Sequence, residues 1–252
     1  MYTADIPEPS AGCFNLIFAD DNKQIVTYPG KSKNMLALKT QREIIKMNSY
    51  EKEWKIQTNK NKFQLVSISS TKPSNIEIDG QILPFNRKAT ILGLTINTHG
   101  IRPHINSRLG KAKSQLKKLK RFKNLQTDTR LRLYKTLIRP ILEYPPIPLC
   151  VASKTNQQKI QRVQNVAIRA AAKERPGDPR STNEQLHNVY NIEAINIRIH
   201  NQAQKIWTKL ESININLIDQ ANVLTEEIAR DHSWWPSVSR YLKQDPPESL
   251  YL

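Results

Sequence analysis

The chain has few cysteines and no long apolar run. Its two cysteines, Cys13 and Cys150, form neither a disulfide framework nor the spacing of a zinc site. No segment approaches the ~18 consecutive apolar residues that a membrane-spanning helix needs. Residues 1–5 lack the basic and apolar segments of a secretory signal. We therefore expect a reduced, nuclear or cytoplasmic protein that has no membrane partner.

Acidic side chains are scarce in one part of the chain. The 252 residues include 39 basic and 22 acidic side chains, a net charge of +17. Residues 101–175 alone hold 19 basic and three acidic ones, a net of +16, whereas residues 1–100 and 176–252 have nets of +4 and −3. A block so rich in one sign repels itself unless a polyanion is near, which indicates a nucleic-acid partner. The alternative is a solvated basic surface that serves solubility.

Residues 1–100 predict an α+β fold, in which an antiparallel sheet is combined with one helix. Two β-rich runs, residues 13–19 and 24–28, predict a hairpin with Asp20 and Asp21 at its tip. The patterns that follow are a helix over 34–58, a strand over 63–69, a hairpin over 76–83 with Asp79-Gly80 in its turn, and a strand over 89–96.

The pattern becomes helical after residue 100. Apolar residues recur at intervals of four, three, four and three in residues 104–123, and these are Ile105, Leu109, Ala112, Leu116 and Leu119. At about 100° per residue they form one stripe. The remaining face carries Lys111, Lys113, Lys117, Lys118, Lys120 and Arg121. The helix can therefore pack by one face and present a basic ridge with the other.

The rest of the chain predicts further helices. One runs from about residue 128 to 138, where Pro140 ends or kinks it, and residues 143–148 contain too many prolines for a helix. Another begins near Thr155, with capping-box spacing to Gln158 and Ile160, Val163, Ala167 and Ala170 facing inward. Two more are expected near residues 182–190 and 194–211. We expect three regions, 1–100, 101–175 and 176–252, with a linker at residues 175–179.

The hairpin tip carries the sharpest chemical feature. Two adjacent carboxylates, Asp20 and Asp21, can hold divalent cations through oxygen ligands. Polymerases use such a pair in two-metal nucleotidyl transfer. Asp-Asp-Asn is also a common composition of an exposed turn, so the residues alone leave both interpretations open. The five histidines are scattered, and we interpret them as ordinary surface or core residues.

From about residue 2 to residue 207, the chain resembles the reverse transcriptases of non-LTR retrotransposons, especially jockey-like elements. Five ordered blocks carry the resemblance: residues 2–7, Phe18-Ala19-Asp20-Asp21, residues 54–62, residues 89–94 and residues 133–144. A four-residue match alone is weak, but five blocks in this order make the resemblance specific. It implies a partial polymerase palm over 1–100, followed by an all-helical thumb.

The resemblance also implies roles for individual residues. Asp20 would be the main ligand of Mg²⁺ or Mn²⁺, with Asp21 in a weaker or supporting role, and the metal is expected only where the active site is completed. Lys62 would lie near the nucleotide triphosphate. Phe18 would pack near the primer terminus, and Leu92-Gly93 would lie against the primer strand. The six basic residues of the helix over 104–123 would hold the RNA template and the RNA–DNA hybrid by their phosphates, which needs no base-reading motif.

The chain departs from the family in ways that affect activity. Only 17 residues precede Phe18, and the family's earlier metal-binding aspartate, nucleotide-binding block and fingers have no counterpart in them. We therefore expect a polymerase fragment that needs the missing N-terminal part as a partner. Two alternatives remain: an inactive remnant that binds nucleic acid through its basic thumb, and an unrelated structural protein whose basic helices bind RNA as ribosomal proteins do.

Overall fold

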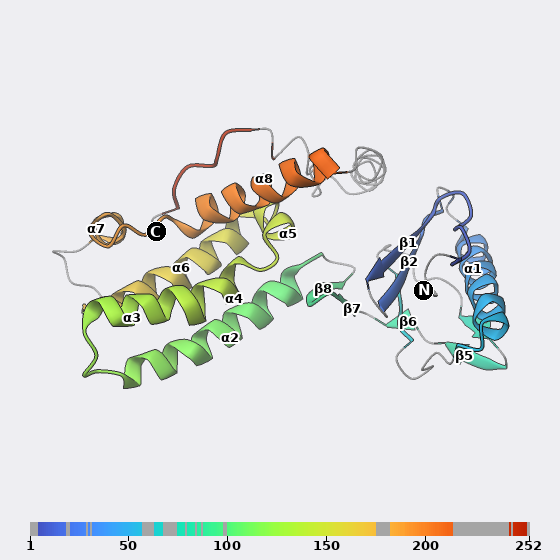
Figure 1. The fold of residues 1–252 in the computed structure, drawn as a ribbon, viewed down its shortest axis with the longest axis horizontal. Helices are drawn as coiled ribbons and strands as arrows, with labels where there is room; N and C mark the ends of the chain where they lie inside the picture. Colours follow the sequence, from blue (N-terminus) through green and yellow to red (C-terminus); the bar gives the residue numbers. More distant parts are fainter. Residues whose placement is uncertain are drawn as a thin grey trace. The chain divides into compact units, whose positions relative to one another are not determined.

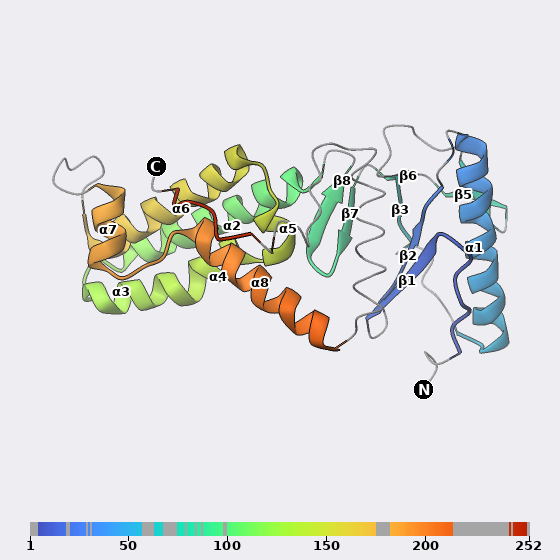
Figure 2. The ribbon, with the colours of Figure 1, turned by 90° about the horizontal axis from the view of Figure 1, so that it is seen from above.

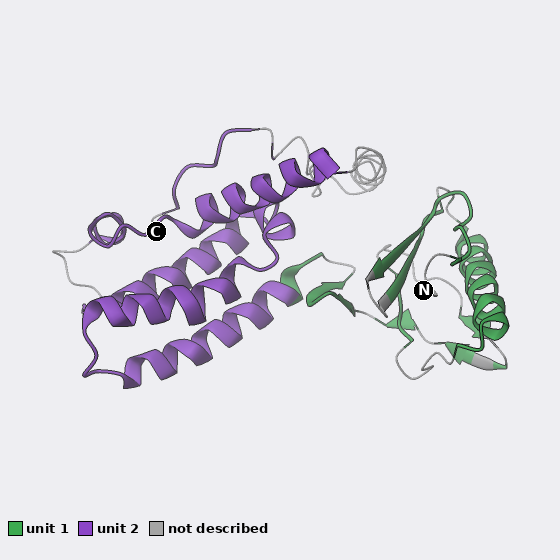
Figure 3. Ribbon diagram, in the orientation of Figure 1, with its two compact units in different colours: residues 1–103 green, residues 104–252 purple. Residues whose placement is uncertain are grey.

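The computed structural model divides the chain into two compact units, residues 1–103 and 104–252 (Figure 3). It describes residues 5–18, 21–28, 30, 32–56, 63–67, 75–78, 80–83, 85–86, 88–97, 100–174, 182–213, 242 and 244–250. For Phe18, Asp21, Ile78 and Gln81 it describes only the backbone. The second unit contains most of the predicted basic helical region, 101–175, and the predicted C-terminal extension, 176–252. The linker predicted at residues 175–179 lies outside the described residues.

The hairpin predicted near the N-terminus is present. Strand β1 (Cys13–Phe18) pairs with β2 (Asp21–Val26) in an antiparallel ladder whose last pair is Phe18 and Asp21. Strand β1 ends one residue before the predicted end, and β2 begins three residues before the predicted start, because Asp21, Asn22 and Lys23 pair within β2 and do not form the turn. The connection is therefore only two residues long, and both of these, residues 19 and 20, lie outside the described residues.

Helix α1 (Lys33–Glu53) follows, and the hydroxyl of Ser32 caps its N-terminus by accepting from the Met35 N–H. It ends five residues before the predicted end. Ile44 is buried on one side of the helix, whereas Ile45 and Trp54 are exposed. The core of this unit consists of Ala37, Ile44 and Ile76, packed against the partly buried Leu65 and Phe85.

The remaining described strands form short pairs. Strand β3 (Leu65–Val66) pairs in parallel with β6 (Phe85–Asn86), and β4 (Ile76–Ile78) forms the predicted hairpin with β5 (Gln81–Leu83). The prediction of a single strand over 89–96 was wrong. Strands β7 (Lys88–Ile91) and β8 (Leu94–Asn97) form a hairpin instead (Figure 2). Leu92 and Gly93 between them have φ angles of 46° and 79°, which reverse the chain in a two-residue turn.

The second unit is helical in its described residues (Figure 1). Helix α2 (Arg102–Arg121) enters it from the first unit. The following elements are α3 (Thr127–Leu133), the π-helical turn η2 (Tyr134–Ile138), α4 (Arg139–Glu143), α5 (Pro146–Cys150), α6 (Lys154–Ala172), α7 (Asn183–Val189) and α8 (Ile195–Ile213). The coarse prediction of an α+β first part and a helical second part therefore agrees with the structure.

Prolines interrupt the helices less than predicted. The helical path continues through Pro140, because η2 widens by one residue and the Arg139 N–H bonds to the Tyr134 carbonyl. Pro140 then lies in the first turn of α4, where its missing N–H is not needed. The prediction that residues 143–148 are not helical was wrong for their second half. Helix α5 begins at Pro146, a position that proline favours.

Helices α6, α7 and α8 occur near the predicted positions, with one change in their capping. Ser153, not Thr155, precedes α6, so the capping box predicted for Thr155 and Gln158 does not form. A capping box does form at α7, where the Thr182 hydroxyl accepts from the Gln185 N–H and the Gln185 amide oxygen accepts from the Thr182 N–H. On α6, Ala170 is only half-buried, whereas Ile160, Val163 and Ala167 are buried as predicted.

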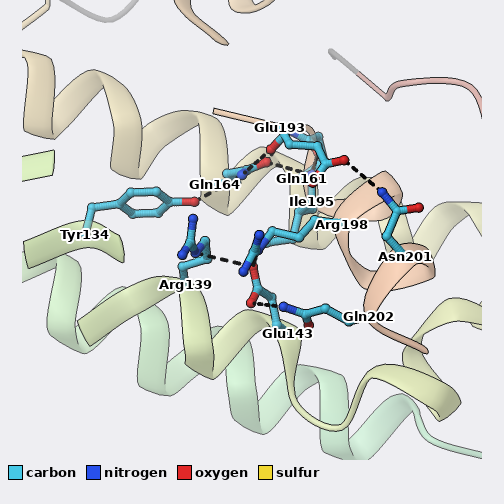
Figure 4. A network of polar contacts seen from close by, with 10 residues as sticks. All are labelled: Tyr134, Arg139, Glu143, Gln161, Gln164, Glu193, Ile195, Arg198, Asn201 and Gln202. Atoms are coloured by element: carbon cyan, nitrogen blue, oxygen red, sulfur yellow. Dashed lines mark hydrogen bonds and ion pairs between the residues drawn. The ribbon is translucent and has the colours of Figure 1, made fainter. Parts of the chain in front are cut away.

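A buried amide cluster joins α6 to the start of α8 (Figure 4). The side-chain oxygens of Gln161 and Gln164 both accept from the Ile195 N–H, each at 2.9 Å. The Gln164 amide nitrogen donates to the Tyr134 hydroxyl and to the Glu193 carbonyl, each at 3.0 Å. Gln161 and Gln164 are fully buried, so these bonds satisfy polar groups that water cannot reach. The cluster thereby fixes the N-terminus of α8 against α6.

A second polar contact joins α4 to α8. The buried Glu143 accepts from the Arg198 guanidinium at 2.5 Å and from the Gln202 amide at 3.0 Å, and its Oε1 lies 3.5 Å from Arg139 Nε (Figure 4).

Burial raises the pKa of Tyr134 well above its usual range, so its hydroxyl stays protonated beside Gln164. Helix α8 is therefore tied to both α4 and α6 by polar groups within the core.

Three histidines, which the sequence left open as surface or core residues, lie in the core of the second unit. Burial lowers the pKa of His104, His187 and His200 below the ordinary value of 6.5. His187 Nδ1 lies 2.7 Å from the Ile192 carbonyl oxygen, and its Nε2 lies 2.9 Å from Asn165 Oδ1. Residues 99 and 232, the other two histidines, lie outside the described residues.

These histidines make stability depend on pH. Their pKa values are lower in the folded chain, so on acidification the unfolded chain takes up protons first. The free energy of unfolding should fall as the pH drops from about 7.5 to about 5.5, above the range in which most carboxylates titrate. Thermal unfolding over this range should show a decreasing midpoint, with a shallower decrease in His200→Gln. A flat midpoint would contradict the burial of these side chains.

Candidate nucleic-acid interface

Helix α2 is held by the apolar stripe that the sequence predicts. The side chains that contact the interior are all at most 9% exposed, and they are Ile105, Leu109, Ala112, Leu116 and Leu119. Because they recur every three or four residues, they fall on one side of the helix. Burial of this stripe sets the rotation of α2 about its axis, and so determines which residues face water.

The opposite side of α2 is a basic face, which we define by six exposed side chains: Lys111, Lys113, Lys117, Lys118, Lys120 and Arg121. Over its full length α2 has eight basic residues and no acidic one. Within the described ranges, no ion pair involves any of the six. Lys118, Lys120 and Arg121 lie in the last turn, where cations interact favourably with the helix dipole.

The dimensions of the basic face suit a polyanion. At 1.5 Å per residue, the ten steps from Lys111 to Arg121 span about 15 Å. Over such a length, a nucleic-acid duplex carries one negative charge per ~1.7 Å, so several phosphates can lie near six cations. Exposed lysines hold their charges on long flexible stems, which contact phosphates without reading bases. The face can therefore bind a nucleic-acid backbone of any sequence.

Several arginines of the same basic block have a structural role instead. Arg130 is buried and donates to the Ala170 carbonyl of α6. Arg139 pairs with Glu143 at 3.5 Å, and Arg169 pairs with Glu174 at 3.6 Å. Sequence reasoning did not separate these side chains from the exposed ones, because a charge count does not show which residues are buried. Of this block, α2 has the densest set of exposed cations, six within 11 residues, whereas the exposed Arg132, Lys154, Lys159 and Arg162 are more widely spaced on α3 and α6.

The other predicted site residues are described only in part. Asp20 and Lys62 lie outside the described residues, and for Phe18 and Asp21 only the strand pairing is known. Leu92 and Gly93 form the β7–β8 turn of the first unit, and the Leu92 side chain is exposed there. Among the side chains that the structure describes, no group of three or more histidine, cysteine or acidic residues is arranged to hold a metal ion.

Comparison of the chain with models of protein families, with curated proteins and with solved structures found no match. No helix in the described part of the chain is both long and apolar enough to cross a bilayer. A functional assignment therefore rests on the chemistry of α2 and on the motifs near positions 20, 62 and 92.

The structure adds one residue that sequence reasoning missed. The Tyr144 ring lies beside α2, with its centre 4.9 Å from the Arg108 guanidinium carbon. His104 Nε2 lies 2.9 Å from the Tyr144 carbonyl oxygen and holds the backbone at this point. Tyr144 is 36 residues from Arg108 in the sequence, and no local pattern marks such a contact. An exposed aromatic side chain therefore lies near the N-terminal half of the basic helix.

We predict that the basic face determines how binding depends on salt. Replacing Lys117, Lys118 and Arg121 together by glutamine should weaken binding to an RNA–DNA duplex. It should also reduce the slope of log affinity against log salt by roughly one for each phosphate that the variant no longer neutralises. The free energy of unfolding should change little, within about 0.5 kcal/mol for each exposed position. Fluorescence anisotropy at several salt concentrations measures the slope.

The matched control removes the same charge from another helix. Lys33, Arg42 and Lys52 are exposed on α1. Their replacement by glutamine should leave the salt slope unchanged. Equal slopes for the two triple variants would show that only net charge matters, and would exclude the basic face of α2 as the interface.

Proposed function

We propose that the chain binds RNA and RNA–DNA hybrids through the basic face of α2, as part of an RNA-directed DNA polymerase of the non-LTR retrotransposon type. One observation carries the binding proposal: six exposed cations share one side of a helix that has no acidic residue. A helix of this kind repels itself in isolation, and phosphates relieve that repulsion. The resemblance in the sequence motifs supports the polymerase part.

Sequence-independent binding fits this function. A polymerase must hold its template and the growing hybrid whatever their sequence, and phosphate contacts fix position without reading bases. The lysine-rich composition of the basic face suits this role, because lysine contacts phosphate as a point charge. With about six phosphate contacts, affinity should fall roughly 10³-fold between about 50 and 200 mM salt.

The β1–β2 hairpin supports a catalytic role for its connection. Phe18 pairs with Asp21 at the end of the ladder, and in the sequence Asp20 directly precedes Asp21. We propose that Asp20 and Asp21 hold Mg²⁺ or Mn²⁺, ions that activate a primer 3′-hydroxyl and stabilise the leaving pyrophosphate. In the same proposal, Lys62 lies near the triphosphate, and the exposed Leu92-Gly93 turn contacts the primer strand.

Completion of such a metal centre needs a further carboxylate. The earlier aspartate strand of the family has no counterpart in these 252 residues. We therefore propose that polymerisation depends on polypeptide that supplies this strand and the fingers region. The second candidate function is binding without chemistry. The basic face of α2 favours it equally, because phosphate contacts by α2 do not depend on the hairpin.

Primer extension separates the two functions. The assay uses an RNA template with an annealed DNA primer, deoxynucleotides and Mg²⁺, and it compares the chain with Asp20→Ala and with Asp128→Ala. Asp128 is an exposed residue of α3 and serves as the control. A polymerase should extend the primer in a metal-dependent way that Asp20→Ala abolishes and Asp128→Ala preserves. Tight hybrid binding without extension would support the binding function instead.

A further inference from the structure

Tyr144 is held at the edge of α2 by two contacts. Its ring is contacted by Arg108, and its carbonyl oxygen lies within hydrogen-bond distance of the buried His104. The residue nevertheless remains 43% exposed. A scattered exposed aromatic residue needs no explanation. Here, however, the backbone and one side of the ring are fixed by residues of the helix that carries the basic face.

Tyr144 belongs to a row of side chains along that edge. Arg108, Lys111, Gln115 and Lys118 follow one another at intervals of three or four residues, so they lie above one another on α2. Phe122 follows Lys118 by four residues in the sequence and comes directly after the end of the helix. It is 49% exposed, and its N–H donates to the Leu119 carbonyl at 3.2 Å.

An exposed aromatic ring therefore lies beside the first residue of the row, a second exposed aromatic residue follows the helix directly, and cations lie between them. From Arg108 to Phe122 the distance along the helix is about 21 Å at 1.5 Å per residue. Two of the intervening side chains, Lys111 and Lys118, also belong to the basic face. Aromatic rings beside a line of cations are the elements that single-strand binding uses, because bases stack on rings while phosphates meet lysines.

We propose that Tyr144 and Phe122 stack unpaired bases of a nucleic-acid strand whose phosphates lie along Lys111 and Lys118. The ligand of α2 is then not a blunt duplex but a duplex with a single-stranded extension. A template has this form where its uncopied part continues beyond the hybrid. This inference rests on the proposed function and adds the type of ligand. Arg108 covers one side of the Tyr144 ring, so the base stacks on the accessible side.

The test compares two ligands: a blunt RNA–DNA duplex and the same duplex with a six-nucleotide RNA extension. The extended ligand should bind more tightly by roughly 5- to 150-fold for each stacked base. Tyr144→Leu and Phe122→Leu should each reduce this gain and leave blunt-duplex affinity unchanged. Tyr144→Phe and Phe122→Tyr keep an aromatic ring and should retain the gain.

A fluorescent base reports stacking directly. With 2-aminopurine in the extension, binding should change its fluorescence in the unmodified protein and in Tyr144→Phe, but not in the double variant Tyr144→Leu, Phe122→Leu. Circular dichroism at the same concentration verifies that each variant is folded.

The outcomes separate this inference from the proposed function. Equal binding of both ligands, or a gain that survives the double leucine variant, would overturn the inference alone. Binding of the free extension strand without binding of either duplex would overturn hybrid binding and the duplex part of the inferred ligand, and would preserve only the stacking role of Tyr144 and Phe122. Absence of binding to all three nucleic acids would overturn both.

Discussion

The stability of helix α2 depends on the balance between repulsion among its charges and burial of its apolar side. Eight positive charges and no negative one lie on 20 residues, which would repel one another on an isolated helix. The buried stripe from Ile105 to Leu119 stabilises the helix against that repulsion by hydrophobic burial. The same stripe turns the lysines toward water. A substitution that weakened the packing of this stripe would therefore change both the stability of the fold and the side of α2 on which the lysines face water.

The surrounding helices show how the positive charge of one sequence block is divided. Arg130, Arg139 and Arg169 contact carbonyl or carboxylate groups within the fold, and so contribute to the link between helices. The amide cluster of Gln161 and Gln164 fixes α8 without any charge. The net charge of the block therefore overstates the charge that faces a ligand. The exposed cations of α2 form a smaller set. They are exposed because burial of the apolar stripe turns the other side of the helix toward water.

The sequence predicted those features that depend on local periodicity or local turn chemistry. The hairpin after Cys13, the Asp-Gly turn of β4–β5 and both faces of α2 follow from such patterns. Prediction from the sequence failed where the backbone or the tertiary packing departs from what the local pattern favours. Leu92 adopts a positive φ that leucine rarely takes, so a hairpin looked like one strand. Pro140 was expected to end or kink a helix, and the helical path instead continues through it after a π-helical turn. Tyr144 reaches α2 through tertiary packing, which no local pattern reveals.

The assignment of Asp20, Asp21 and Lys62 to chemistry remains a prediction from sequence motifs, whereas the basic face of α2 is a feature of the structure. The central claim is that this face contacts nucleic acid. Acetylation of lysines, read by mass spectrometry with and without an RNA–DNA hybrid, tests it most directly. We expect the hybrid to protect Lys111, Lys113, Lys117, Lys118 and Lys120 from acetylation, whereas Lys33 and Lys52 of α1 should be modified equally in both samples. Equal modification of the α2 lysines with and without the hybrid would contradict it.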